Sequence, residues 1–247
     1  MNRIKDYDRL AFDIDRWLKD YYYIHAIKAF VVGVSGGIDS AVVSTLCAKT
    51  KLPTYVMTMP LHSKKENTEL SNLHAYKLVE KYSNVTLVNV DLSKTYDKFM
   101  VAVDDKFTTN KLANANTKSR LRMVSLYQVA GAVRGIVVGT GNKVEDYGVG
   151  FYTKYGDGGV DIAPIADLYK TEVWELGKHL GVDERIVDAV PTDGLWDDGR
   201  KDEDQIGASY EQLEEAMEYR RGPALDILDE FNRKNKHKME PIPTFKL

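Results

Sequence analysis

The sequence predicts an α/β fold: a single doubly wound domain over residues 1–247, in which helices flank a mostly parallel five-stranded sheet. Two observations predict it. Short apolar runs rich in β-branched residues alternate with longer segments of helical periodicity, and this alternation is typical of right-handed βαβ units. Glycine-containing turns follow the first and the fourth apolar run. In such a sheet both turns lie beyond the carboxyl ends of the strands, where ligands bind.

The first elements are an amphipathic helix, a buried strand and a second helix. Residues 29–34 form a continuous apolar run, as expected of a strand covered on both faces. Residues 38–49 follow a pair of glycines and have helical spacing. The opening helix lies within residues 1–28, where apolar side chains recur at three- and four-residue steps: Ile4, Tyr7, Leu10, Ile14, Trp17, Leu18 and Tyr21.

Two further strands and a helix between them come next. The strands are predicted over residues 54–59 and 85–90, both apolar and β-branched. A capping box, Ser63-x-x-Glu66, predicts the start of the helix, which runs through Lys81. A polar stretch then leads into a long helix.

That long helix, over about residues 117–134, precedes a fourth strand over residues 135–139. Residues 150–160, GFYTKYGDGGV, are too rich in Gly and Tyr for a regular element and predict a functional loop. A helix over residues 169–180 follows. Residues 192–205 are predicted to form an exposed, mobile loop.

The end of the chain is predicted to be helical. Ser209-x-x-Gln212 is a second capping box. A final helix runs from about residue 224 to the basic segment KNKHK at residues 234–238.

Composition disfavours several classes of partner. Lys and Arg number 34 against 37 Asp and Glu, a net charge of −3, so no general attraction to nucleic acid or to an anionic membrane is expected. The N-terminal segment carries charges throughout, and no apolar run is long enough to span a bilayer. We therefore expect a cytoplasmic protein. The single cysteine, Cys47, lies in an apolar run and predicts a packing role.

The turn after the first strand, Gly33-Val34-Ser35-Gly36-Gly37, is the first candidate site. It leads from a buried strand into a helix N-terminus, where free N–H groups and the helix dipole attract anions. Paired glycines let the backbone approach a phosphate closely. Asp39, in the first helical turn, is placed to hold a divalent cation bridging phosphates.

Two other interpretations fit the same five residues. The five residues match the G-x-S-x-G nucleophile elbow of hydrolases, but that elbow needs a histidine base, and only His237 lies in a segment that looks functional. Asp39 would also place negative charge where an oxyanion must be stabilised. A tight turn with no ligand is the other interpretation, because glycine pairs serve turns generally.

Residues 35–40, SGGIDS, resemble the SGGxDS loop of the N-type ATP pyrophosphatases, which use ATP to adenylate a carbonyl or carboxylate oxygen. Four later segments are similar to ammonia-dependent NAD synthetases within that superfamily: NTKSRLRM (116–123), GTGNKVE (139–145), the run from FYTKYGDGG onward (151–181) and KHK (236–238). Motifs in this order identify the chain as a member of that family.

The resemblance implies a reaction. Nicotinic acid adenine dinucleotide, ATP and ammonia give NAD, AMP and pyrophosphate, through a carboxylate that is first adenylated. ATP is the co-substrate and Mg²⁺ the implied metal, with Asp39 and Glu145 as its ligands. The implied ATP contacts are Ser35, Gly36, Gly37, Asp39, Ser40, Thr140, Lys170 and Thr192.

For the acid dinucleotide the resemblance implies a second set of residues. Asn116, Arg120 and Arg122 would grip it, Phe151 and Tyr21 would sandwich the nicotinate ring, and His237 and Lys238 would close over the nucleotide. Lys154 and Asp157 would lie at the nicotinate end, with Asp157 near the ammonia; together with Lys170 they are the implied catalytic residues. Taken singly, the arginines would be assigned to a solvated helix face and the aromatics to the core.

The family is homodimeric, so we expect a homodimer in which the N-terminal helix (residues 1–28) forms a contact and Tyr21 enters the partner's site. About 28 residues before the first strand cannot hold a glutaminase domain, which predicts ammonia as the nitrogen source. Thr58 replaces an arginine of many members, and Gly141 and Asn142 stand where many have Asp-His. These departures leave the adenine contacts open.

Rival assignments have weaker support. Thiolating tRNA enzymes of the superfamily generally need several cysteines, and GMP synthetase would lack the YTKYGDGG run. A regulatory module with lost chemistry would not be expected to keep both Asp39 and Glu145.

Overall fold

A parallel sheet lies at the centre of the computed structural model, which describes residues 3–192 and 201–246. Its strand order is β3-β2-β1-β4, and all three neighbouring pairs are parallel. The strands are β1 (Phe30–Gly33), β2 (Thr54–Thr58), β3 (Val85–Asn89) and β4 (Ile136–Val137). This confirms the α/β class and the parallel sheet flanked by helices.

The predicted count of five strands is wrong, because the sheet has four strands within the described ranges. Beyond β4 the chain contributes a single isolated bridge, in which Val138 pairs with Ile162. Pro164 follows two residues later, and a proline has no N–H with which to extend the ladder. A fifth strand therefore starts but is not propagated.

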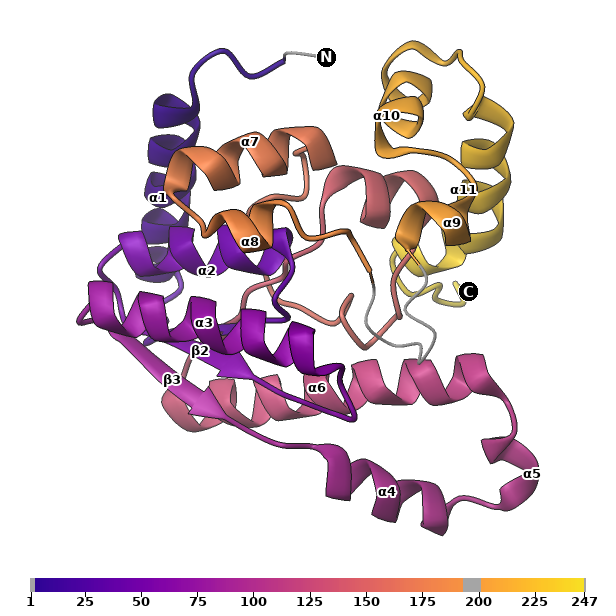
Figure 1. Ribbon diagram of the computed structural model, residues 1–247, viewed down its shortest axis with the longest axis horizontal. Coiled ribbons are helices and arrows are strands. Elements are labelled where there is room, and N and C mark those ends of the chain that lie inside the picture. Colours follow the sequence, from indigo (N-terminus) through magenta and orange to yellow (C-terminus); the bar gives the residue numbers. More distant parts are fainter. Residues whose placement is uncertain (1–2, 193–200, 247) are drawn as a thin grey trace.

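Helices cover both faces of this sheet (Figure 1). They are α1 (Tyr7–Ile24), α2 (Ile38–Lys49), α3 (Lys65–Lys81), α4 (Ser93–Ala102), α5 (Asp105–Thr108), α6 (Lys111–Val133), a π-helix (Lys143–Val149), α7 (Lys170–Leu180), α8 (Glu184–Val187), α9 (Asp202–Ile206), α10 (Tyr210–Tyr219) and α11 (Leu225–Met239). Successive residues of β1 point to opposite faces: Val32 packs in the cluster with α1, α2 and α7, whereas Val31 packs in the cluster with α6.

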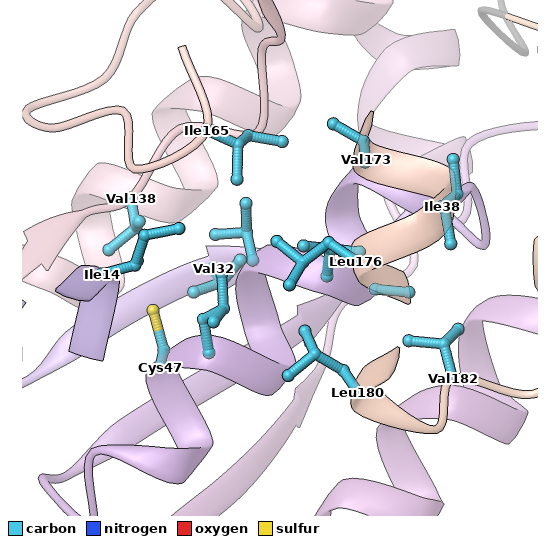
Figure 2. Close-up of a cluster of buried hydrophobic side chains, with 14 of the residues drawn as sticks. Ile14, Val32, Ile38, Cys47, Val138, Ile165, Val173, Leu176, Leu180 and Val182 are labelled. Atoms are coloured by element: carbon cyan, nitrogen blue, oxygen red, sulfur yellow. The ribbon is translucent and has the colours of Figure 1, made fainter. Parts of the chain in front are cut away.

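The largest apolar cluster joins the N-terminal helix to the middle of the chain. Figure 2 shows Ile14 of α1, Val32 of β1 and Leu176 of α7 converging on it. Cys47 is fully buried in the same cluster, which confirms its predicted packing role. A second cluster holds α10 and α11 against the π-helix.

The two predicted capping boxes have different outcomes. The box at Ser209 is present: its hydroxyl accepts from the N–H of Gln212, whose side chain accepts from the N–H of Ser209. The box at Ser63 is wrong, since α3 begins at Lys65 and has no side-chain cap. The Ser63 hydroxyl instead accepts from the N–H of Leu61, a local turn bond that competes with capping.

Several helical segments lie where the sequence predicted no helix. The polar stretch before residue 117 contains α5 and the first turns of α6, which begins at Lys111 with Asn110 as its cap. These turns are largely exposed, so they carry little apolar periodicity. Helix α9 overlaps the end of the predicted mobile loop 192–205, and residues 193–200 of that prediction lie outside the described residues.

No helix in the part of the chain that the structure describes is long and apolar enough to cross a membrane. The cytoplasmic location stays a prediction.

Candidate active site

The glycine loop joins β1 to α2 and has one residue in a left-handed conformation. Gly36 has φ +94°, and a Cβ there would lie 2.8 Å from the carbonyl oxygen of Asn67 in α3, so the position requires glycine. The loop is braced from inside by Ser40, whose hydroxyl accepts from the N–H of Ser35 at 3.1 Å and donates to Gly37 O at 3.0 Å. The α2 N-terminus therefore opens onto the loop in a fixed geometry.

The central feature of the site is a buried cation between two carboxylates. The Lys170 ammonium donates to Asp39 Oδ2 at 2.5 Å and to Glu145 Oε1 at 2.9 Å. Lys170 is only 3% exposed, because it is the first residue of α7 and that helix packs on α2. Residues 39, 145 and 170 come from three separate segments, and the carboxyl ends of β1 and β4 bring two of them together.

Two further side chains fix these carboxylates. Asn142 is fully buried; its Nδ2 donates to Asp39 Oδ1 at 3.0 Å, and its Oδ1 accepts from the N–H of Glu145. Tyr210, also fully buried, donates its hydroxyl to Glu145 Oε1 at 2.7 Å. Glu145 therefore receives two donors at the same oxygen, from Lys170 and Tyr210.

Burial and pairing act in opposite directions on these pKa values. Burial raises the pKa of Asp39, and the neighbouring Lys170 only partly offsets it. For Glu145 burial also opposes ionisation, but Lys170 and the Tyr210 hydroxyl together hold its pKa below the usual value. The two carboxylates raise the pKa of Lys170 despite its burial, so this ammonium stays charged.

A second group of polar side chains surrounds Asp157 in the Gly-Tyr loop, the name used here for residues 150–160. Its Oδ1 accepts from the Ser119 hydroxyl at 2.6 Å and from the N–H of Thr153 at 3.1 Å. The Thr153 hydroxyl donates to Asn116 Oδ1 at 2.6 Å. Asp157 is accessible from the cavity, yet the protein around it raises its pKa, an effect that these hydrogen bonds oppose.

The predicted substrate-gripping cations are held by main-chain carbonyls. Arg122 is largely buried, and burial lowers its pKa. The contacts are Arg120 to Lys154 O at 3.3 Å, Arg122 to Met59 O at 3.1 Å, Lys154 to His237 O at 2.8 Å, and Lys238 to Tyr152 O at 2.9 Å and to Gly150 O.

One cavity of about 740 Å³ brings most of these residues together. The predicted residues that line it are Ser35, Gly36, Gly37, Asp39, Asn116, Arg120, Arg122, Thr140, Glu145, Phe151, Lys154, Asp157, Lys170, Thr192, His237 and Lys238. Ser40 is not among its lining residues and braces the loop from behind. Tyr21 lies on α1, where its ring packs 4.3 Å from that of His25, and it does not line the cavity of its own chain.

Sequence reasoning missed three residues that shape the site. Asn142 carried a usable signal, because Asn before a short helical run is a favoured N-cap. Ser119 carried a weaker one, since it lies one helical turn after Asn116 and faces the same way. Tyr210 carried none, because its hydroxyl reaches Glu145 across 65 positions of sequence.

The donor set fits a magnesium ion better than a transition metal. Among the residues described, no group of three or more His, Cys, Asp and Glu side chains is arranged to hold a metal. Two carboxylates alone are what Mg²⁺ commonly takes from a protein when phosphates complete its shell. Asp39 and Glu145 already converge on one cation, the Lys170 ammonium.

Comparison with known proteins gives consistent results. The family model described as NAD synthase matches residues 11–242. An NH(3)-dependent NAD(+) synthetase of Finegoldia magna is 33% identical over 242 residues, 97% of each chain. Among solved structures, an NMN synthetase of Francisella tularensis has a TM-score of 0.91 at 30% identity, covering 99% of this chain and 100% of that one. An NH3-dependent NAD synthetase of Campylobacter jejuni has a TM-score of 0.78 at 25% identity, covering 98% and 100%.

Proposed function

Because this chain belongs to the NAD synthase family, we propose that its cavity binds the reactants with ATP at the glycine loop and the acid dinucleotide at the Gly-Tyr loop. The reaction is the ATP-dependent amidation of nicotinic acid adenine dinucleotide to NAD with ammonia, through an adenylated carboxylate, releasing AMP and pyrophosphate. The enzyme is a ligase. The observation that carries our placement is the Asp39–Lys170–Glu145 cluster beside the glycine loop.

The glycine loop is proposed to hold the pyrophosphate part of ATP. Gly36, Gly37 and the α2 N-terminus offer main-chain N–H groups, and Ser35 offers its hydroxyl. Ser35 acts as a phosphate ligand and forms no acyl intermediate. Thr140 and Thr192 line the same cavity and extend the nucleotide contacts.

Asp39 and Glu145 are proposed to hold Mg²⁺, and Lys170 to contact the phosphates. A magnesium ion would neutralise charge that develops on the phosphates and polarise the bond to the leaving pyrophosphate. Lys170 lies between the same carboxylates, so it is within reach of any phosphate that a metal at this place would bind.

At the other end of the cavity, Asp157 is proposed to receive ammonia. A carboxylate whose pKa is raised is a better proton acceptor for an incoming ammonium ion. Arg120, Arg122, Asn116 and Lys154 are proposed to orient the acid dinucleotide, and Phe151 to stack on its ring. His237 and Lys238 form the wall contributed by α11.

We also propose a homodimer in which α1 is an interface helix. Large apolar side chains of α1, Phe12, Tyr23 and Ile24, are between 56% and 75% exposed. Tyr21, on the same helix, would then reach the partner's cavity. Sedimentation of the protein and of a Phe12→Glu, Ile24→Glu variant tests this; a wild-type monomer that is active at high dilution would contradict it.

A product assay tests the function directly. The protein, Mg-ATP and nicotinic acid adenine dinucleotide should give NAD, AMP and pyrophosphate with ammonium and no NAD with glutamine alone. NAD formation that proceeds equally well with glutamine would overturn ammonia as the nitrogen source, and failure with ammonium would overturn the reaction.

A second substrate is favoured by one observation. The likeness to the NMN synthetase of Francisella tularensis is greater, at a TM-score of 0.91, than that to the NAD synthetase of Campylobacter jejuni, at 0.78. We therefore propose that nicotinic acid mononucleotide be tested beside nicotinic acid adenine dinucleotide in the same assay. A higher kcat/KM for the mononucleotide would reassign the substrate but leave the adenylation chemistry intact.

A further inference from the structure

Tyr210 is the first residue of α10, and its side chain lies wholly inside the protein beside the charged cluster. Its hydroxyl donates to Glu145 Oε1 at 2.7 Å, and its ring centroid is 5.2 Å from the Lys170 ammonium. The ring of Trp174, on α7, meets it edge-on at 5.7 Å. One side chain therefore contacts both a carboxylate and the cation of the cluster.

The backbone of Tyr210 is tied to a different wall of the cavity. Its N–H donates to Glu203 Oε1 at 2.9 Å, and Glu203 belongs to α9. Two other residues of α9, Asp202 and Gln205, line the cavity. Tyr210 thus links the α9 wall to Glu145 through one residue.

A buried tyrosine hydroxyl needs an acceptor in any case, and this chain contains a purely structural example. Tyr169 is 1% exposed and donates to Glu218 Oε2 at 2.9 Å. Glu218 does not line the cavity, whereas Glu145 does. Both tyrosines are buried and both donate to a glutamate carboxylate, but only the acceptor of Tyr210 faces the cavity.

We propose that Tyr210 is a positioning residue that fixes the Glu145 carboxylate for metal binding, an inference that rests on the proposed function. With the hydroxyl in place, one oxygen of Glu145 is held by Tyr210 as well as by Lys170, which restricts rotation of the carboxylate away from Asp39. The residue acts through Glu145 and does not itself contact the substrates.

The test measures metal binding in four forms of the whole protein: wild type, Tyr210→Phe, Tyr169→Phe and Glu145→Gln. Free Mn²⁺ is counted by electron paramagnetic resonance as Mn²⁺ alone is added. Partners that orient a metal ligand are typically worth about tenfold or more in affinity, so Tyr210→Phe should weaken Mn²⁺ binding about tenfold. Tyr169→Phe should leave it unchanged, and Glu145→Gln should weaken it further. Tryptophan fluorescence, to which Trp174 contributes as one of three tryptophans, is the check that the ring at position 210 stays in place.

Turnover gives an independent readout of the same role. In Tyr210→Phe the Mg²⁺ concentration for half-maximal AMP formation should rise about tenfold, with the KM for the acid dinucleotide unchanged. Equal Mn²⁺ affinity in wild type and Tyr210→Phe, or equal weakening in both tyrosine variants, would overturn the positioning role alone. Mn²⁺ affinity that does not depend on Glu145 would overturn the metal assignment, and this inference with it, while NAD formation by the wild type would still stand.

Discussion

The two ends of the cavity hold their charges in different ways. In the nucleotide end, defined here as the glycine loop with Asp39, Glu145 and Lys170, charged side chains pair with one another. In the acid end, defined as Arg120, Arg122, Lys154, Asp157 and Lys238, the cations are held by main-chain carbonyls. In the nucleotide end the cation is paired with carboxylates, whereas in the acid end the cations donate to neutral carbonyls, which are weaker acceptors.

This difference indicates which end must rearrange. A phosphate or carboxylate is a stronger acceptor for Arg or Lys than a neutral carbonyl, so an anion that enters the acid end can displace a carbonyl at little cost. In the nucleotide end the Asn142 amide and the Tyr210 hydroxyl also hold the two carboxylates, so the geometry of the charged cluster is fixed from several sides. We therefore expect substitutions there to affect chemistry and stability, and substitutions at the acid end to affect substrate affinity.

Asp39→Asn should have the largest effect. It keeps the shape of the side chain but removes a charge from the proposed metal site, and metal stabilisation is worth several kcal/mol, which corresponds to a loss on the order of a thousandfold in AMP formation. Pyrophosphate release measures it, with circular dichroism as the control for folding. Turnover near that of the wild type would remove Asp39 from the metal site and erase the contrast between the two ends.

Lys170→Met should cost about 3 kcal/mol in the free energy of unfolding, because it leaves two partly buried carboxylates without their buried cation. In the variant both carboxylate pKa values should lie above their unfolded values, because burial already raises the pKa of Asp39 and Glu145 loses the ammonium that lowers its own. The deficit should therefore be full near neutral pH and shrink as the pH falls toward the unfolded pKa values. Urea unfolding of both proteins at pH 7.5 and pH 4.5 measures it; a deficit that is equal at both pH values would argue against mutual repulsion.

His74 should make the stability of the contact between α2 and α3, the two helices beside the glycine loop, depend on pH in the acid range. Its Nε2 lies 2.9 Å from the Ser44 hydroxyl, joining α3 to α2, and burial lowers its pKa from 6.5 to about 4. The unfolded chain takes up a proton as the pH falls below 6.5 and the folded chain does so only near pH 4, so stability is lost across that window. The loss should reach about 2 kcal/mol between pH 8 and pH 5. His74→Gln should remove this component, and an unchanged pH profile in the variant would contradict the assignment.

Arg120→Lys should have the smallest effect and the most selective one. Arg120 presents two nitrogens to the same carbonyl, and a lysine cannot reproduce that fork. The KM for the acid dinucleotide should rise about tenfold, the worth of one charge-assisted contact, with little change in the KM for ATP. Arg134→Lys, at the far end of α6, is the matched control. A parallel rise in the KM for ATP would place Arg120 at the nucleotide end.

Most of the framework was predictable because it depends on local pattern. The continuous apolar run at β1 and the glycine pair before α2 fix one strand, one turn and one helix without reference to the rest of the chain. The carboxyl ends of β1, β2 and β3 lie within one residue of the predicted ends, and Pro60 marks the one at β2, two residues after Thr58. Strand β4 ends at Val137, two residues before the predicted end at residue 139. Helices such as α4 were not predicted, since α4 has no buried residue to give it a period.

The site was less predictable where side chains meet by tertiary packing. Sequence placed Asp39, Glu145 and Lys170 in one site but did not show that Lys170 lies between the two carboxylates. Equally, nothing local indicates that Lys238 is bound to carbonyls of the Gly-Tyr loop, or that Tyr210 reaches Glu145. Such contacts depend on how α7, α10 and α11 dock, and that is decided by packing over the whole core.

The π-helix at Lys143–Val149 makes the geometry of the site depend on the number of residues in this one segment. Its wide turn is closed by hydrogen bonds from Gly150 and Phe151 to the carbonyl of Glu145, and π-helices of this kind are rare and concentrate at functional sites. Removing one residue would let the segment relax to an ordinary α-helix and rotate Glu145 away from Asp39. Insertions and deletions are usually tolerated between secondary-structure elements, but here a change in the number of residues from 143 to 149 would move Glu145 and so disturb the site.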